Sequence, residues 1–408
     1  METTGFRSGI NLRVIKMQPT TKFLRPLLSL AAVVTLVGCG APSGTATVSS
    51  SKPAGVPTSN ASAAALGVVV VEPDVWGPMP GKPPSTYLAA IIGLDGRIKA
   101  SIRALTPTAL CCFPLVSVAG SHVYYLDGNT KLMRLDLDGS TAQVASLPGG
   151  SHDRVVLAVE PESGRIAFGV AHIGANTCPS QNAPGCTPPV STQLWVAAAD
   201  GTGARKLPSN RFPIAWHSGQ IVVGSKGAFL QNRGEANPYL AGDLALVDPN
   251  TGQVTDMTAS CGVPAGPLVQ AGIACEHSSA TFTTSVTALG WDGHETVLGS
   301  SLASSGSAAL SPDGTMAAAS TATRSDTGVW TFDLMLAQHG NLTSLHISAV
   351  PAGWFDATHL LVNTNATPAI APTYKILDVV NGGVVSVDLA GNEGYVTSGG
   401  YFASFPSE

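Results

Sequence analysis

Short runs of apolar and alternating residues, separated by tight polar turns, fill most of this sequence. The stretch from Pro114 to Pro148 shows the pattern most clearly, with β-branched and aromatic runs at 115–119, 122–126, 131–136 and 141–147. Between them stand Gly120-Ser121, Asp127-Gly128-Asn129 and Asp138-Gly139. Such turn residues supply the positive φ that tight hairpins need. The stretch therefore predicts a four-stranded antiparallel meander, which is too thin to bury both faces unless it stacks on copies of itself.

Two kinds of turn recur along the chain and alternate strictly. If the strands of one meander are called a, b, c and d, the c-d turns lie at Asp95-Gly96, Asp138-Gly139, Asp200-Gly201, Asn250-Thr251-Gly252, Asp292-Gly293, His339-Gly340-Asn341 and Asn381-Gly382. The a-b turns follow an apolar residue or Trp at Val118, Val159, Trp216, Val269, Leu310, Trp354 and Val396. Four strands repeated about every 40 to 45 residues are typical of a β-propeller blade. The chain is therefore predicted to be all-β, with a seven-bladed β-propeller over residues 66–408.

The order of the turns also predicts how the propeller closes. The series begins with a c-d turn at Asp95 and ends with an a-b turn at Val396. Residues 87–103 would then supply the outer strands of a composite blade, and residues 394–405 its inner strands, which leaves no free sheet edge. Residues 66–76 have no place in this count.

The a-b turn Leu310-Ser311-Pro312-Asp313-Gly314 resembles the Trp-Ser-Pro-Asp-Gly corner of the WD-like repeats in periplasmic propellers of the Tol system. Val159-Glu160-Pro161-Glu162-Ser163-Gly164 is a looser copy, while Trp216 and Trp354 keep the aromatic residue and lose the Pro-Asp. The resemblance covers about five residues in each repeat. It implies propeller architecture and, in some relatives, protein binding, and it carries no catalytic residues.

The N-terminus predicts export and a lipid anchor. Lys22 and Arg25 precede the apolar run 26–37, which ends in Leu36-Val37-Gly38-Cys39, and this order resembles the signal peptide and lipobox of bacterial lipoproteins. The resemblance implies cleavage before Cys39 and acylation of its thiol, with residues 1–39 as signal peptide. Met17 makes residues 1–16 a candidate for a misassigned start. Residues 40–65 are rich in Ser, Thr, Pro, Gly and Ala, a composition that predicts a disordered tether. The expected location is the extracytoplasmic side of a bacterial membrane.

Composition and charge limit the classes of partner that the domain is expected to bind. The chain is 44% hydrophobic and only 12% charged, which is the composition of a globular protein. Removal of residues 1–39 would leave 16 basic and 25 acidic residues, a net charge near −9. Such a charge argues against a nucleic-acid partner and against a polybasic membrane-binding surface. The domain is expected to be a monomer that meets the membrane through its lipid alone.

Six cysteines remain in a compartment that favours disulfides. Cys178 and Cys186 bracket one Pro-containing insertion, and Cys261 and Cys275 bracket another, so local bridges are predicted for both pairs. Each would stabilise the fold by roughly 2 to 3 kcal/mol on the loop-entropy scale. Cys111 and Cys112 are adjacent, so they are either a strained vicinal disulfide, two thiols or ligands of a soft metal. No second pair at zinc spacing supports the metal.

Common catalytic motifs are absent from the sequence. There is no GxSxG, P-loop, HExxH or paired CxxC, and the nine His residues are scattered singly. Asp136-Leu137-Asp138-Gly139 is half of a calcium loop at most and is better explained as a hairpin turn. Trp216, Trp291 and Trp354 could stack on a sugar ring, but their repeated positions favour core packing. We therefore predict no catalytic residue, no metal and no cofactor.

The distribution of long connections predicts where a partner binds. In a propeller the a-b and c-d hairpins share one face, and the b-c and d-a connections share the other. The long segments, 104–114, 173–192, 226–242, 257–267, 321–327 and 363–373, all belong to the second face. Loops held by a rigid scaffold often carry function, although neutral drift would produce the same asymmetry. Arg233, Glu235, Asn237 and Tyr239 are the candidate binding residues, beside the insertion at Cys178 and Cys186.

Two hypotheses of different classes follow. The first is a binding module that presents this face to a protein, peptide or glycan. The second is a propeller enzyme, a hydrolase or lyase acting on glycans or peptides, which would need carboxylates or His residues converging at the mouth of the central channel.

Overall fold

The computed structural model describes residues 65–72, 86–107, 115–150, 153–173, 190–224, 244–257, 263–278, 284–302, 304–324, 326, 330–364, 373–389, 395–396 and 403–404. All of them belong to one compact unit over residues 60–408. The described residues contain strands and turns and no helix, so none that could cross a membrane.

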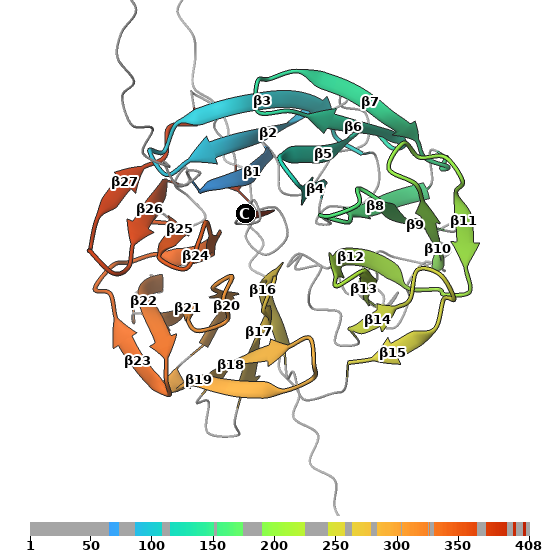
Figure 1. Ribbon diagram of the computed structural model, residues 1–408. Helices are drawn as coiled ribbons and strands as arrows, with labels where there is room; N and C mark the ends of the chain where they lie inside the picture. Colours follow the sequence, from blue (N-terminus) through green and yellow to red (C-terminus); the bar gives the residue numbers. More distant parts are fainter. Residues whose placement is uncertain are drawn as a thin grey trace, which may run out of the picture. The chain divides into compact units, whose positions relative to one another are not determined.

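The strands form seven antiparallel sheets that follow one another around a ring (Figure 1). Blade 1 contains β1 (Leu66–Glu72), β2 (Thr86–Gly93) and β3 (Ile98–Leu105), together with β28 (Tyr395–Val396) and β29 (Ala403–Ser404). Blade 2 contains β4 (Val116–Ala119), β5 (His122–Asp127), β6 (Lys131–Leu135) and β7 (Thr141–Ser146). Blade 3 contains β8 (Asp153–Val159), β9 (Ile166–Ile173), β10 (Val190–Ala197) and β11 (Arg205–Leu207).

The other four blades repeat this pattern. Blade 4 contains β12 (Phe212–His217), β13 (Gln220–Gly224), β14 (Ala245–Val247) and β15 (Val254–Asp256). Blade 5 contains β16 (Val263–Val269), β17 (Gly272–Ser278), β18 (Thr284–Gly290) and β19 (Glu295–Leu302). Blade 6 contains β20 (Ser304–Leu310), β21 (Ala317–Arg324), β22 (Trp330–Gln338) and β23 (Asn341–Ser344). Blade 7 contains β24 (Val350–Trp354), β25 (His359–Asn363), β26 (Tyr374–Asp378) and β27 (Val384–Ser386).

The prediction of an all-β, seven-bladed propeller is confirmed. In blades 2 to 7 the hydrogen-bonded order follows the sequence order, so each blade is a meander whose first strand lies near the centre of the ring and whose fourth lies outside. Glycines in the turns have the left-handed backbone that the Asp-Gly and Asn-Gly pattern requires, for example Gly139 at φ 85° and Gly201 at φ 77°.

Blade 1 differs in detail from the predicted composite. The strand next to β2 is β1, in register from Leu66 opposite Gly93 to Val71 opposite Leu88. The C-terminal strands β28 and β29 lie on the other side of β1, nearer the centre of the ring, and each pairs with two residues of β1. Residues 66–72, which the turn count left unassigned, thus take the second position that had been given to the C-terminal segment. Closure of the ring through the short C-terminal ladders stays a prediction.

The core lies between blades rather than within them. Each of seven clusters of buried apolar side chains is drawn from adjacent blades. Between blades 1 and 2, for example, Val68 and Tyr87 pack with Leu115 and Val123, all of them 2% exposed or less. Because neither face of a single sheet is covered without its neighbours, the blades stabilise one another.

Hydrogen bonds near the a-b turns join one blade to the next. Trp216 Nε1 in blade 4 donates to the Ala158 carbonyl of blade 3 at 2.9 Å, and Trp354 Nε1 in blade 7 donates to the Ala309 carbonyl of blade 6 at 2.9 Å. Both indoles are buried, at 9% and 2% exposure. The core interpretation of these two tryptophans is therefore correct. Trp291 differs, since it is partly exposed and stacks on His217 with ring centroids 5.1 Å apart.

Turn glycines make a second set of contacts between blades. A Cβ on Gly201 of blade 3 would lie 2.4 Å from the Cβ of Ala145 in blade 2, and one on Gly252 of blade 4 would lie 2.4 Å from Cδ of Pro208. The equivalent position in blade 1, Gly96, would meet the Ser386 carbonyl at 2.2 Å. These c-d turns therefore rest against the outer strand of the preceding blade, where a side chain has no room.

Candidate functional site

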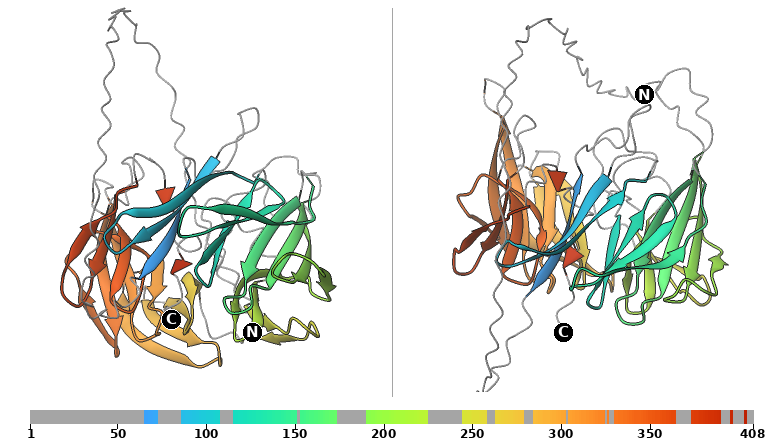
Figure 2. Two further views of the ribbon diagram at one scale, coloured as in Figure 1. Left: turned by 45° about the horizontal axis from the view of Figure 1, so that its top comes forward. Right: turned by 90° about the horizontal axis from the view of Figure 1, so that it is seen from above.

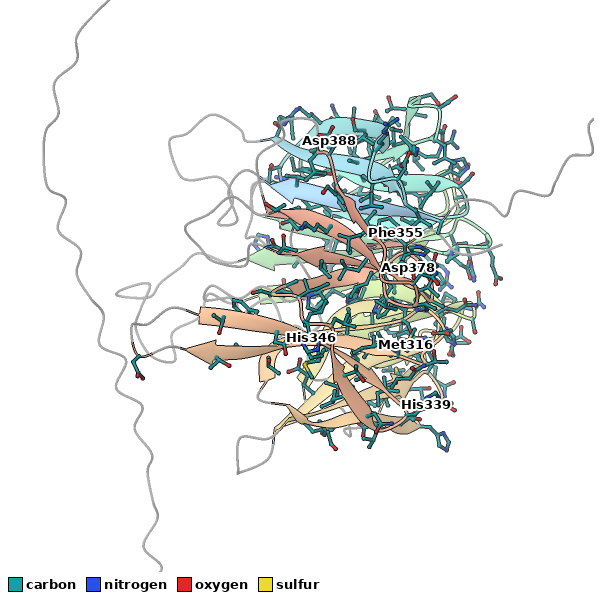
Figure 3. All side chains as sticks on the ribbon, turned by 90° about the vertical axis from the view of Figure 1, so that its left-hand side faces the viewer. Met316, His339, His346, Phe355, Asp378 and Asp388 are labelled. Carbon is teal, nitrogen blue, oxygen red and sulfur yellow. The ribbon has the colours of Figure 1, made fainter. Side chains whose placement is uncertain are left out.

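The antiparallel order gives the ring two unlike faces. The face formed by the a-b and c-d turns is called the short-turn face, because its connections have seven residues or fewer. The face formed by the b-c and d-a connections is called the loop face, and it holds the long segments 174–189, 225–244 and 364–373. Seen from the side, strands cross the ring from one face to the other (Figure 2). Figure 3 shows Met316, His339, Phe355 and Asp378 on one side of the sheets, which is the short-turn face.

Most of the predicted site residues lie outside the described residues. These are the binding candidates Arg233, Glu235, Asn237 and Tyr239, the lipidation site Cys39, and the cysteines Cys111, Cys112, Cys178, Cys186 and Cys261. Cys275 is described; it is fully buried in β17 and disulfide-bonded. Its pairing with Cys261 remains a prediction. The strand bounds do place residues 233–239 between β13 and β14, which is a b-c connection of the loop face.

Charged pairs tie strand ends together on the loop face, and one of them lies where the long connection 174–189 begins. In blade 3, His172 Nδ1 lies 2.6 Å from Asp153 Oδ1, which joins the end of β9 to the start of β8. The other carboxylate oxygen of Asp153 accepts the Gly150 amide at 2.7 Å. In blade 4, Arg211 donates to Asp256 at 2.7 Å, next to the end of β15. The described base of the loop face is thus held by ion pairs around segment 174–189 and beside blade 4.

Carboxylates gather at the short-turn face, and the turns themselves use them. One aspartate in each of six c-d turns accepts hydrogen bonds from backbone amides two or three residues ahead, and we call these the turn aspartates: Asp95, Asp138, Asp200, Asp248, Asp292 and Asp378. Hydrogen bonds to the ionised carboxylate hold the pKa of each turn aspartate below its ordinary value. For Asp95 the largest cause is the hydrogen bond from the Lys99 ammonium, and for Asp378 it is the hydrogen bond from the side-chain amide of Asn381.

Further charges lie at the same ends of the strands. Five more carboxylates are Asp136, Glu160, Glu162, Asp313 and Asp356. The cations in these turns or within two residues of them are Arg97, Lys99, Arg134, Arg165, Arg205 and Lys206. The described part of the short-turn face is therefore acidic on balance.

Glu160 and Arg165 form the most buried ion pair of this face. Arg165 donates from Nε to Oε2 at 2.6 Å and from a terminal nitrogen to Oε1 at 2.8 Å, and its guanidinium lies 5.0 Å from the centre of the Trp216 ring. Ser163 also donates to the carboxylate. The guanidinium hydrogen bonds lower the pKa of Glu160 and in turn raise that of Arg165. This contact locks the a-b turn of blade 3 against blade 4.

Histidines pair with carboxylates inside blades 2 and 7. His122 Nδ1 lies 2.5 Å from Asp136 Oδ1, and His359 Nδ1 lies 2.9 Å from Asp356 Oδ2. Burial alone would raise the pKa of Asp136, but the hydrogen bonds from His122 and Arg134 lower it. Asp136 and Asp138 are thus both engaged in their hairpin, as the turn interpretation of Asp136-Leu137-Asp138-Gly139 expects. Sequence spacing hides the first pair, since Asp136 lies fourteen residues after His122, whereas Asp356 stands only three residues before His359.

The pKa shifts of the described carboxyl groups share one direction. Every described Asp or Glu with a shifted pKa is shifted downward, which favours a fixed anion over a proton donor, whereas burial raises the pKa values of Tyr124 and Tyr125. Within the same residues, no three His, Cys, Asp or Glu side chains come together as a metal would require.

No protein-family model and no curated protein matches the sequence. Solved structures do match, at low sequence identity. They include TolB from Acinetobacter baumannii, with 16% identity, TM-score 0.38, and coverage of 68% of this chain and 65% of TolB, so the chain spans less than two thirds of that protein. An oligogalacturonate lyase in complex with manganese has 9% sequence identity and a TM-score of 0.45, with coverage of 73% of this chain and 88% of the lyase. The β-propeller domain of the Trilobed protease from Pyrococcus furiosus has 12% identity and a TM-score of 0.41, with coverage of 67% of this chain and 83% of that domain. The class of the protein, a seven-bladed β-propeller, rests on its own seven sheets.

Proposed function

We propose that this chain is a lipid-anchored, extracytoplasmic β-propeller that binds a protein, peptide or glycan partner through its loop face. The observation that supports the proposal is that the two faces differ: one consists of short structural turns, and the other holds the long connections. The short-turn face uses its turn aspartates, glycines and tryptophans to hold strands and blades together. The long connections gather at the opposite edge of the sheets, where their length is not needed to join neighbouring strands.

The proposal gives the partner a place to bind between blades 3 and 4. Segments 174–189 and 225–244 are b-c connections of neighbouring blades. The first contains Cys178 and Cys186, and the second contains Arg233 and Tyr239, residue types in which binding energy often concentrates. A bridged loop loses less entropy when a partner orders it. The alternative of a hydrolase or lyase would gain support from an acid with a raised pKa at the channel mouth.

Binding can be tested once a partner has been captured with the anchored protein. Arg233→Ala and Tyr239→Ala should each weaken binding by about 1–2 kcal/mol, measured by calorimetry. Asp138→Ala on the short-turn face is the control and should leave the affinity unchanged. Equal losses for all three variants, or none, would end the proposal of a loop-face site.

Anchoring is tested separately. Cys39→Ala should move the protein from the membrane fraction to the soluble fraction with unchanged thermal unfolding, because Cys39 lies outside the unit that contains the blades. A Cys39→Ala protein that still sediments with membranes would refute the lipid anchor.

A further inference from the structure

Asp-Gly and Asn-Gly pairs, which shape the turns of this propeller, are also its chemically labile positions. The glycine nitrogen can attack the side-chain carbonyl carbon of the preceding residue, because glycine has no Cβ to hinder the approach. The glycine of each pair has a positive φ, between 69° and 85°. The structure describes all seven pairs of the sequence: Asp95-Gly96, Asp127-Gly128, Asp138-Gly139, Asp200-Gly201, Asp292-Gly293, Asp313-Gly314 and Asn381-Gly382. Their surroundings therefore decide which of them reacts.

Six of the seven pairs are held inside their own hairpin turn. Their glycine amides donate to a backbone carbonyl three or four residues earlier, for example from Gly139 to Asp136 at 3.0 Å. In five of the six, the aspartate side chain accepts a hydrogen bond from the amide two residues ahead, as Asp138 does at 2.8 Å. In the sixth, the Asn381 side chain donates to Asp378 at 2.8 Å. Each of these pairs must break its own turn before the nitrogen can reach the side-chain carbon.

Asp127-Gly128 is held by a different blade. The Gly128 amide donates to the Leu105 carbonyl at 2.8 Å, and the Leu105 amide donates to Oδ1 of Asp127 at 3.0 Å. Leu105 is the last residue of β3 in blade 1, whereas the pair belongs to the b-c connection of blade 2 on the loop face. The other carboxylate oxygen lies 3.7 Å from Nζ of Lys131, an exposed ion pair that adds little. Both reacting groups thus depend on one residue across the junction.

The contact through Leu105 lies at a strand end. Leu105 is opposite Thr86, the first residue of β2, and its side chain is 44% exposed. Strand ends open locally at a lower free energy than the middle of a sheet. The remainder of the b-c connection has its own support, because the Leu147 amide donates to the Thr130 carbonyl inside blade 2 at 2.7 Å. Local opening at Leu105 therefore releases Asp127-Gly128 while the sheets of both blades stay folded.

We propose that Asp127-Gly128 is the site at which this propeller isomerises spontaneously to isoaspartate, and that opening of the junction between blades 1 and 2 controls the reaction. The Gly128 nitrogen forms a bond to Cγ of Asp127. One carboxylate oxygen leaves as water with the amide proton and a proton from solvent, which closes a succinimide ring. Water then adds to either ring carbonyl and restores aspartate or gives isoaspartate, whose main chain runs through Cβ and Cγ. The reaction requires neither the lipid anchor nor a binding partner.

The test compares the seven pairs within one molecule. The full chain is aged at neutral pH, and mass spectrometry with electron-based fragmentation measures isoaspartate at each pair and deamidation at Asn381. The same chain in concentrated urea gives the rate without structure, and the rate in urea divided by the native rate is the protection of that pair. Protection at Asp127-Gly128 should be at least about tenfold lower than at the other six, which corresponds to an opening free energy lower by ~1.4 kcal/mol. Equal or greater protection there would overturn the proposal.

Two variants test the control by the junction. Leu105→Pro lacks the amide that Asp127 accepts and keeps a residue type that the end of an edge strand tolerates. It should raise the native rate at Asp127-Gly128 about tenfold, the effect of losing one hydrogen bond to a charged group, and leave the other six rates unchanged. Gly128→Ala is the chemical control: its Cβ would meet nothing within 4 Å, yet it hinders ring closure. It should slow the reaction in both native and urea samples, and an unchanged rate would contradict the succinimide route.

A third arm needs no substitution, so it decides the matter even where Leu105→Pro does not fold. The wild-type chain is aged in urea concentrations below its unfolding transition. The rate at Asp127-Gly128 should rise with urea while the other six stay constant, because a local opening exposes less surface than global unfolding. A parallel rise at all seven pairs would show that global unfolding controls the reaction and would refute the role of the junction.

Discussion

Replacing Gly201 with alanine should destabilise the propeller through a contact between blades 2 and 3. Gly201 has φ 77°, and a Cβ added there would lie 2.4 Å from the Cβ of Ala145. Carbon atoms prefer a separation of about 3.5–4.0 Å, so the two methyl groups would overlap by more than ~1 Å. Either the c-d turn of blade 3 or strand β7 must move.

The matched control stands two residues away in the same turn. Gly203 has φ 62°, and a Cβ added there would meet nothing within 4 Å. Gly203→Ala therefore carries the backbone cost of a left-handed residue, about 1 kcal/mol, without the clash. Gly201→Ala should carry the same cost plus about 1–3 kcal/mol for overpacking. The difference between the two variants measures the contact between blades.

Urea unfolding followed by circular dichroism and by tryptophan fluorescence gives both free energies, provided that the two probes coincide. Ala145→Gly in the Gly201→Ala background should recover part of the loss, with a coupling energy of at least about 1 kcal/mol in the double-mutant cycle. Equal destabilisation by Gly201→Ala and Gly203→Ala, or no coupling to Ala145, would refute the argument that the c-d turn of blade 3 packs on blade 2.

Three further predictions test other parts of the fold. Trp354→Phe removes the indole bond to the Ala309 carbonyl and should cost about 1–2 kcal/mol in urea unfolding, more than Trp291→Phe, whose indole is partly exposed; a larger loss for Trp291→Phe would contradict this. The lowered pKa of Glu160 means that its stabilisation is complete above the unfolded pKa of about 4.5 and is lost as the pH falls through the folded pKa. Glu160→Gln should thus cost about 2 kcal/mol at pH 7 and progressively less below pH 4.5, and a pH-independent difference would refute the ion-pair explanation. Deletion of residues 393–408 removes β28 and β29 from β1 and should lower the melting temperature of the whole propeller, so unchanged melting would argue against closure through these strands.

The fold could be predicted because short local residue pairs, such as Asp-Gly, determine its turns. Asp138-Gly139, Asp200-Gly201 and Asp292-Gly293 each encode a positive-φ turn, and their spacing encodes the blade. β1 was missed because neither segment beside the apolar run Val68 to Val71 contains an Asp-Gly or Asn-Gly pair. Its place depends on pairing with β2, whose bounds the turn pattern does fix.

The interactions that join blades were only partly predictable. The repeated position of Trp216 and Trp354 indicated core packing, but the carbonyls that accept from them belong to the preceding blade, more than forty residues earlier. The pairing of Glu160 with Arg165 is local, whereas the stacking of that guanidinium on Trp216 is not. The binding residues Arg233 and Tyr239 were chosen from the length and composition of one connection, and the fold adds to that choice only their place on the loop face.

Photo-crosslinking in intact cells tests the central claim, binding through the loop face, most directly. A photoreactive amino acid would be placed at Asn237 and Ser348 on the loop face, and at Val380 on the short-turn face. The account predicts that the two loop-face positions form the same covalent adduct with a macromolecular partner and that position 380 does not. An adduct formed from position 380 alone would contradict it.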